Sequence, residues 1–140
     1  GAMAEFSISG LSELIGDLEG IAALPDEVAR EMLEAEADVI ERTQKAVGEA
    51  MGVHRTGVTL GSITHGSMGR GSGGDRVMYV YPDGRNPKGE RNAAVAFVNE
   101  YGKRGQPARP FIRTANEAGA DEAAEAAARI YDSYLKNRDL

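Results

Sequence analysis

The sequence predicts an α+β domain in which a long N-terminal helix and a C-terminal helix pack on a small, mostly antiparallel sheet. Three observations predict this class. A one-sided apolar stripe at helical spacing runs through residues 25–51. Short segments rich in Val, Tyr and Phe follow at 76–82 and 93–101, and a second helical pattern closes the chain. The 140 residues suffice for one domain with a core but not for two ordinary domains.

Residues 1–24 are predicted to hold a tag remnant and then an N-terminal arm or short helix. The opening Gly-Ala-Met resembles a protease-cleavage scar, so the fold is expected to begin after it. Glycines interrupt the apolar residues that follow at helical spacing, and glycine costs about 1 kcal/mol in a helix interior. This segment is therefore either a short amphipathic helix or an arm that orders only on a partner. The apolar positions are Leu11, Leu14, Ile15 and Leu18.

Residues 25–140 are predicted to form the single domain, beginning with a helix over 25–51. Pro25 suits the first helical position, and Asp26 and Glu27 place negative charge at the positive end of the helix dipole. The apolar stripe of this helix faces a polar side rich in Asp and Glu. Such a one-sided helix must pack on another element, most simply a sheet.

Two strands are predicted next, at 76–82 and 93–101, joined by a polar connection of 10 residues. Apolar residues alternate with their neighbours in both segments, which indicates a core-facing side rather than a surface for stacking bases. The alternating residues are Val77, Tyr79, Tyr81, Val95, Phe97 and Tyr101. The preceding segment, 65–75, contains five glycines and is predicted to be a flexible loop.

The last helix is predicted to begin at Thr114. Thr114 and Glu117 have the spacing of a capping box, in which each side chain bonds a backbone N–H at the start of a helix. A stripe of alanines follows and ends in larger apolar residues, so a partner helix can approach closely.

Composition excludes several classes of protein. The chain has no cysteine, so it has no disulfide framework, thiol catalysis or Cys-ligated metal. Its histidines, His54 and His65, are too few for the usual zinc sites unless carboxylates complete them, and no HExxH motif is present. The Gly-rich segment lacks the Gly-Lys-Ser/Thr ending of a phosphate loop. We therefore expect no catalytic residue, cofactor or metal, and a soluble, intracellular protein without a membrane segment.

Charge is distributed unevenly along the chain. Residues 1–53 carry 12 acidic and 3 basic side chains, a net charge of −9, and residues 54–113 carry 4 and 10, a net charge of +6. The remainder carries 6 and 3, which gives the total of −6. Either the basic middle binds nucleic acid, or basic loops of one copy meet acidic helices of the next. The negative total argues mildly against a dedicated DNA-binding domain.

Residues 99–117 concentrate four cations around two prolines and an aromatic. Such a segment is a phosphate-binding loop, the solvated rim of a connector, or a docking surface. Pro107 and Pro110 bias the residues before them towards extended backbone, and Phe111 is expected to anchor this stiff connector in the core. The connector would then present its cations at fixed positions for salt bridges across a subunit boundary. The candidate interface residues are Lys103, Arg104, Arg109 and Arg113.

Two motifs resemble those of a phage neck-protein family, named after gene product ten of lambda-like siphophages. Its members are head–tail joining, tail-completion or minor tail proteins. The first motif lies in "FVNEYGKRGQPARPFIRTA" and the second in "RTGVTLGSI". The matching residues of the first are Glu100, Tyr101, Gly102, Pro107, Pro110 and Phe111, and those of the second are Thr56, Gly57, Leu60, Ser62 and Ile63. Lys103 stands where the family often has Thr, and Thr114 where it often has Pro.

The resemblance implies a non-enzymatic virion protein made in the bacterial cytoplasm and located at the head–tail junction or in the tail. Its implied partners are copies of itself in a ring, head-completion or connector proteins, and tail-terminator or tail-tube proteins. Genomic DNA would pass through the lumen without sequence-specific binding. The alternative from the residues alone is a small DNA-binding accessory protein that uses the basic middle.

Overall fold

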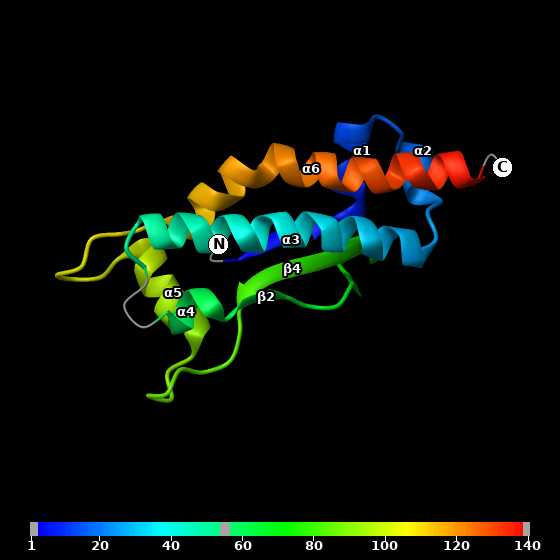
Figure 1. Ribbon diagram of the computed structural model, residues 1–140. Helices are drawn as coiled ribbons and strands as arrows, with labels where there is room; N and C mark the ends of the chain where they lie inside the picture. The colour runs from blue at the N-terminus through cyan, green and yellow to red at the C-terminus, as the bar shows by residue number, and fades with distance from the viewer. Residues whose placement is uncertain (1–2, 54–56, 139–140) are drawn as a thin grey trace.

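A computed structural model describes residues 3–53 and 57–138 of the chain. It shows an elongated molecule in which two long helices lie side by side above a narrow sheet (Figure 1). The fold class predicted from the sequence, α+β, is confirmed. The strands are β1 (Ala4–Ser7), β2 (Ile63–His65), β3 (Gly69–Arg70) and β4 (Arg76–Pro82). The helices are α1 (Ile8–Ile15), α2 (Leu18–Ala22), α3 (Asp26–Ala50), α4 (Val58–Gly61), α5 (Asn92–Tyr101) and α6 (Phe111–Arg138), with a 3-10 turn at Ser72–Gly74.

The sheet is antiparallel and centred on β4, with β1 on one side and β2 on the other. Ala4 pairs with Val80 and Ile63 with Pro82, and the short β3 pairs with the beginning of β4. The strand predicted at 76–82 is thus confirmed, but the side of it that faces the core is not the predicted one. Met78 and Val80 are completely buried. On the opposite face Val77 is buried as predicted, but Tyr79 and Tyr81 are only half-buried. Apart from Arg76, both sets of alternate residues are apolar, so alternation does not say which face is covered.

Helix α3 covers one face of the sheet, and α6 packs along α3 (Figure 1). The predicted helix over 25–51 is confirmed, with Pro25 one position before its first residue. Gly119 in α6 allows a close approach, because a Cβ there would lie 3.0 Å from Ile40 Cδ1 and 3.1 Å from Thr43 Oγ1. The buried Gln44 donates a hydrogen bond from Nε2 to Asn116 Oδ1, at 2.9 Å, across the same interface.

Residues 4–24 form part of this domain rather than a separate arm in the structure. β1 extends the sheet. α1 and α2 are short helices, so of the two predicted forms, a short helix or an arm, the structure has the helical one. Asp17 caps α2 by accepting a hydrogen bond from Gly20 N at 2.9 Å. Asp17 also accepts the hydroxyl hydrogen bond of Tyr131 in α6, which raises the pKa of Tyr131 to about 12. Both ends of the chain are thereby joined in one core, to which Ile8, Leu11, Ile21 and Leu24 contribute.

Two secondary-structure predictions are wrong, one in the type of an element and one in the start of a helix. Residues 93–101 form most of helix α5, not a strand. The final helix begins at Phe111, one turn before Thr114, so Thr114 lies inside it and its backbone N–H bonds Pro110 O at 3.0 Å. Tertiary contacts override the weak local signals in both cases, as the joint described below shows.

The Gly-rich segment 65–75 has more regular structure than the predicted flexible loop. It contains the end of β2, the whole of β3 and the 3-10 turn. Gly71 N donates a hydrogen bond to Asp75 O at 2.7 Å, and Arg70 Nη1 donates one to Gly74 O at 3.2 Å. The structure does not test whether this segment is mobile, and that part of the prediction stays a prediction.

Candidate assembly interface

Helices α5 and α6 meet in a joint that is held by Glu100. Its side chain is 4% exposed. Glu100 Oε1 accepts a hydrogen bond from Ile112 N at 2.8 Å, and Oε2 accepts one from Arg113 N at 3.2 Å. The first backbone N–H groups of a helix have no partner within it, and a carboxylate also stabilises the positive end of the helix dipole. Glu100 of α5 is therefore the cap of α6, the role that the sequence assigned to Thr114 and Glu117.

Replacement of Glu100 by alanine should destabilise the domain by about 1–3 kcal/mol, because one buried and one partly buried N–H group lose their acceptor. Urea unfolding followed by circular dichroism measures this change. Glu125→Ala is the control, because Glu125 is an exposed glutamate on α6. An effect of Glu100→Ala no larger than that of the control would contradict the capping role.

The chain between the two helices leaves α5 through Gly102 and makes a tight turn. Gly102 has φ +78° and ψ 177°, and a Cβ on it would lie 2.8 Å from Ala108 N. Lys103 N donates a hydrogen bond to Gln106 O at 3.0 Å, and Gln106 N donates one to Lys103 O at 2.9 Å. Arg104 and Gly105 therefore form the tip of the turn. Lys103 and Arg104 are exposed on this projecting turn.

Arg109 lies in the same connection but contacts its own chain. Its Nη1 donates a hydrogen bond to Gly52 O at 3.2 Å, just beyond the C-terminus of α3, and its backbone N donates one to Asn99 O at 2.6 Å. A cation near a helix C-terminus is favourable because of the helix dipole. Arg109 therefore has a structural contact that the sequence did not indicate, in addition to its exposed surface.

Arg113 projects from the first turn of α6 and is exposed. It borders a hollow of about 440 Å³ between the start of β1, the end of α5 and the first turns of α6. Glu117 follows one turn after Arg113 on the same helix. The residues around the hollow are Met3, Glu100, Tyr101, Arg113, Asn116, Glu117 and Ala120. Arg113, one of the four predicted interface cations, thus lies beside a concave surface.

Two aromatic residues expected in the core are exposed on α5. Phe97 is 55% exposed and Tyr101 is 52% exposed, and their ring centroids lie 4.7 Å apart. In a helix, residues four positions apart lie on the same side, so the pair forms one apolar patch. The sequence pattern predicted a strand here, with both side chains on its core-facing side.

The second motif forms the corner between α4 and β2. Gly57 precedes α4 with φ +72°, a conformation that favours glycine. Leu60 and Ile63 are buried, and Ser62 accepts a backbone hydrogen bond from Asp83 N at 3.0 Å. Thr56 of this motif lies outside the described residues.

The two motifs pack together around Gly48 of α3. A Cβ on Gly48 would lie 2.4 Å from Leu60 Cδ2 and 3.1 Å from Phe111 Cδ2. Phe111 has no exposed surface, as expected for the anchor of the connector. Segments about 50 residues apart in sequence therefore build one joint, from which the basic connector projects.

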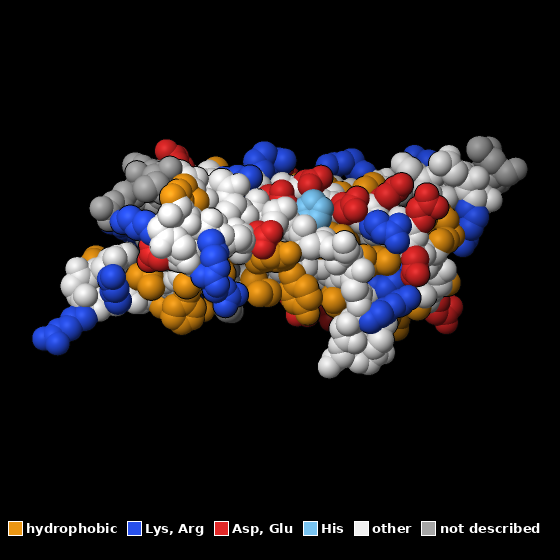
Figure 2. Space-filling model, turned by 90° about the horizontal axis from the view of Figure 1, so that it is seen from below, with side chains coloured by type: hydrophobic (Ala, Val, Ile, Leu, Met, Phe, Trp, Pro, Cys, Tyr) orange, Lys and Arg blue, Asp and Glu red, His pale blue; other side chains and the backbone are white. Residues whose placement is uncertain are grey.

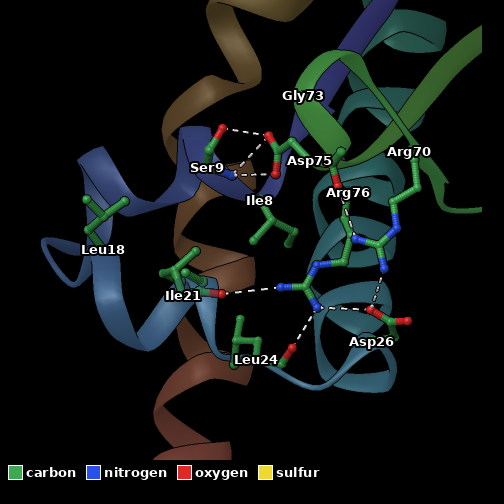
Figure 3. Close-up of a pocket in the computed structure, with 12 residues that line it drawn as sticks. Ile8, Ser9, Leu18, Ile21, Leu24, Asp26, Arg70, Gly73, Asp75 and Arg76 are labelled. Carbon is green, nitrogen blue, oxygen red and sulfur yellow. Dashed lines mark hydrogen bonds and ion pairs between the residues drawn. The ribbon is translucent and has the colours of Figure 1, made fainter.

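The opposite end of the molecule has a second hollow, of about 450 Å³, between α1, α2 and the start of β4 (Figure 3). Arg76, one of the 10 basic residues counted in 54–113, is buried there. Its guanidinium donates hydrogen bonds to Leu24 O at 2.6 Å and Ile21 O at 3.3 Å, and also to Asp26 Oδ1 at 3.2 Å. These contacts attach the N-terminal helices to β4. Arg76 is therefore a structural residue rather than a contact for a ligand.

The structure describes His65 but not His54. Among the described residues, one group has the composition of a metal site: Asp38, Glu41 and His65. No helix in the described part of the chain is both long and apolar enough to cross a membrane. Comparison of the chain with protein-family models, curated proteins and solved structures found no match.

Proposed function

We propose that this chain is a structural subunit of a tailed phage or prophage, of the head–tail joining or tail-completion type. Copies of it assemble into a ring between the capsid connector and the tail, and genomic DNA passes through the lumen. The observation that carries this proposal is the joint around Gly48, where both family-like motifs pack together and the basic connector projects. The motif residues thus position the connector. In this proposal the chain has no enzymatic role.

The charge at the two ends supports a ring of identical subunits. Residues 13–34, which include the end of α1, α2 and the start of α3, carry 7 acidic and 1 basic side chains, and Arg70 and Arg76 from elsewhere in the chain pair with Asp26 among them. Residues 85–113 carry 7 basic and 2 acidic side chains, a net charge of +5. These segments lie at opposite ends of the elongated molecule (Figure 1), and Lys and Arg side chains project at the end that carries α5 (Figure 2). A closed ring needs such a heterologous contact between two different surfaces.

Exposed apolar side chains support the same contact. Phe97 and Tyr101 lie at the basic end, and Leu14 and Leu18, each 67% exposed, lie at the acidic end. Protein interfaces usually have an apolar centre surrounded by polar and charged residues. Each end offers both components, so one end of a subunit complements the other end of its neighbour.

Arg113→Glu is expected to impair assembly into particles without unfolding the domain. Arg113 is exposed and its charge reversal places like charges in the subunit contact, which costs affinity. Electron microscopy of particles carrying the variant measures assembly, and circular dichroism checks the fold. Arg129→Glu is the matched control, because Arg129 is an exposed arginine further along α6. Normal tailed particles with Arg113→Glu would contradict the interface.

Arg109→Glu is a less selective test of the same surface. It also removes the hydrogen bond to Gly52 O, so part of its effect will be a loss of stability. The isolated chain is expected to be a monomer or weak oligomer in light scattering, because the ring completes on its partners. A closed ring formed without any partner would contradict this order of assembly.

A DNA-binding accessory protein is the second candidate, and the exposed rings of Phe97 and Tyr101 beside the basic connector favour it. Aromatic side chains near cations stack on the bases of single strands. Retention of short DNA by the purified domain, with a steep loss as salt increases, would support this candidate. Neighbouring genes for portal, capsid and tail-tube proteins would support the neck subunit.

A further inference from the structure

We propose that Asp38, Glu41 and His65 form a binding site for a divalent cation of the zinc class. Asp38 and Glu41 belong to α3, and His65 is the last residue of β2. One ligand atom from each side chain lies within 4.8 Å of the other two. This site is independent of the proposed subunit contact.

Two elements hold the three side chains in place. Residues three positions apart on a helix are neighbours on its surface, so α3 presents both carboxylates on one side. β2 packs against α3, and the pairing of His65 with Val80 in β4 sets the position of the histidine. His65 Nδ1 and Glu41 Oε1 share a short hydrogen bond of 2.5 Å, which a bound cation would replace by displacing its proton. The three donors converge because the sheet packs on the helix, although 24 residues separate Glu41 from His65.

The composition of the ligand set selects the class of cation. One imidazole nitrogen with two carboxylate oxygens suits Zn²⁺ and similar transition-metal ions, whereas Mg²⁺ and Ca²⁺ prefer sites made of oxygen alone. The side chains of His65 and Glu41 are 26% and 19% exposed, and Asp38 is exposed. A cation can therefore enter from the side of Asp38, with water completing its coordination.

The charge around the group also favours a cation. The long helix α3 belongs to the acidic part of the chain, and in the described residues no Lys or Arg forms an ion pair with Asp38 or Glu41. The exposed carboxylate of Asp38 is therefore free of cationic side-chain partners among the ion pairs of the described residues and can bind a cation from solvent. A bound divalent cation would neutralise the group and fasten β2 to α3.

Isothermal titration of the full chain with ZnCl₂, after treatment with EDTA, tests the proposal. We expect one ion per chain, and a weakening of affinity by at least ~10-fold in both Asp38→Asn and His65→Ala. Asp38→Asn keeps the size of the side chain at an exposed position, so it tests the site even if His65→Ala fails to fold. The matched controls are Glu49→Gln, an exposed glutamate on the same helix, and His54→Ala, the other histidine. Both should bind Zn²⁺ as the parent chain does.

The second measurement is the NMR signal of the His65 imidazole nitrogens, which should shift when Zn²⁺ is added but not when Mg²⁺ is added. Three results would overturn the proposal. These are absence of Zn²⁺ binding, unchanged affinity in Asp38→Asn, and loss of binding in His54→Ala with binding kept in His65→Ala. Equal affinity for Mg²⁺ and Zn²⁺ would likewise overturn it, because the imidazole would then have no part in binding.

Discussion

Gly102→Ala is expected to destabilise the domain by about 2–4 kcal/mol, through backbone strain together with a steric clash. The φ and ψ of Gly102, +78° and 177°, lie in a region that is almost restricted to glycine. A Cβ would also lie 2.8 Å from Ala108 N and 2.9 Å from Gln106 O. Because these are backbone atoms, they cannot rotate away, and the whole connector must shift. Urea unfolding measures the stability, and particle assembly should decline as well.

Gly105→Ala provides the matched control for this prediction. Gly105 has a similar φ of +83°, but nothing lies within 4 Å of a Cβ placed on it. Its replacement should therefore cost only the conformational strain, about 1–2 kcal/mol. If both variants lost the same stability, the close approach of backbone to Gly102 would not be the reason for its presence.

Glu36→Gln is expected to remove a large pH dependence of stability. Glu36 is 6% exposed on α3, its Oε1 has no hydrogen-bond partner, and burial raises its pKa to about 8. The unfolded chain ionises this group from about pH 4.5, the usual value, so the protonated native state loses relative stability as pH rises from 4.5 to 8. The loss is on the order of 5 kcal/mol for a difference of roughly 3.5 pKa units, which is an upper limit.

The measurement is urea unfolding between pH 5 and 8.5 with EDTA present, so that no divalent ion contributes. Glu36→Gln should flatten the decline and be more stable than the parent chain at pH 8.5. Glu49→Gln, on the exposed side of the same helix, should keep the parent slope. A slope shared by all three chains would show that another group titrates.

The sequence predicted the long elements well because their signals are local and repeated. The apolar stripe in 25–51 predicted α3, and the alternation in 76–82 predicted β4. In each case a single pattern extends over the whole element. The strand prediction for 93–101 was wrong because a short segment rich in apolar residues fits both the helical and the strand period. Contacts with the rest of the fold decide between helix and strand. Its helical form then places Phe97 and Tyr101 on the surface, which no local pattern indicated.

The sequence predicted the exposed basic connector, but not the contacts that hold it. The connector, its exposed cations and the buried Phe111 follow from residues 99–117. The cap of α6 was not predicted because Glu100 lies in the preceding helix, whereas a capping box consists of residues next to the helix start. Arg76 was misplaced because counting charges along a chain does not distinguish a buried guanidinium from an exposed one.

By itself, the sequence determined the fold class, the two long helices, the central strand and the uneven distribution of charge, since each depends on composition or on periodicity within one segment. Only the tertiary structure decided which sheet face is covered and how Glu100 caps α6. It also decided that Leu60 and Phe111 meet at Gly48, and that Asp38 and Glu41 approach His65. These arrangements join residues distant in the chain, and their energies depend on burial and close approach. Those quantities exist only once the helices and the sheet have packed together.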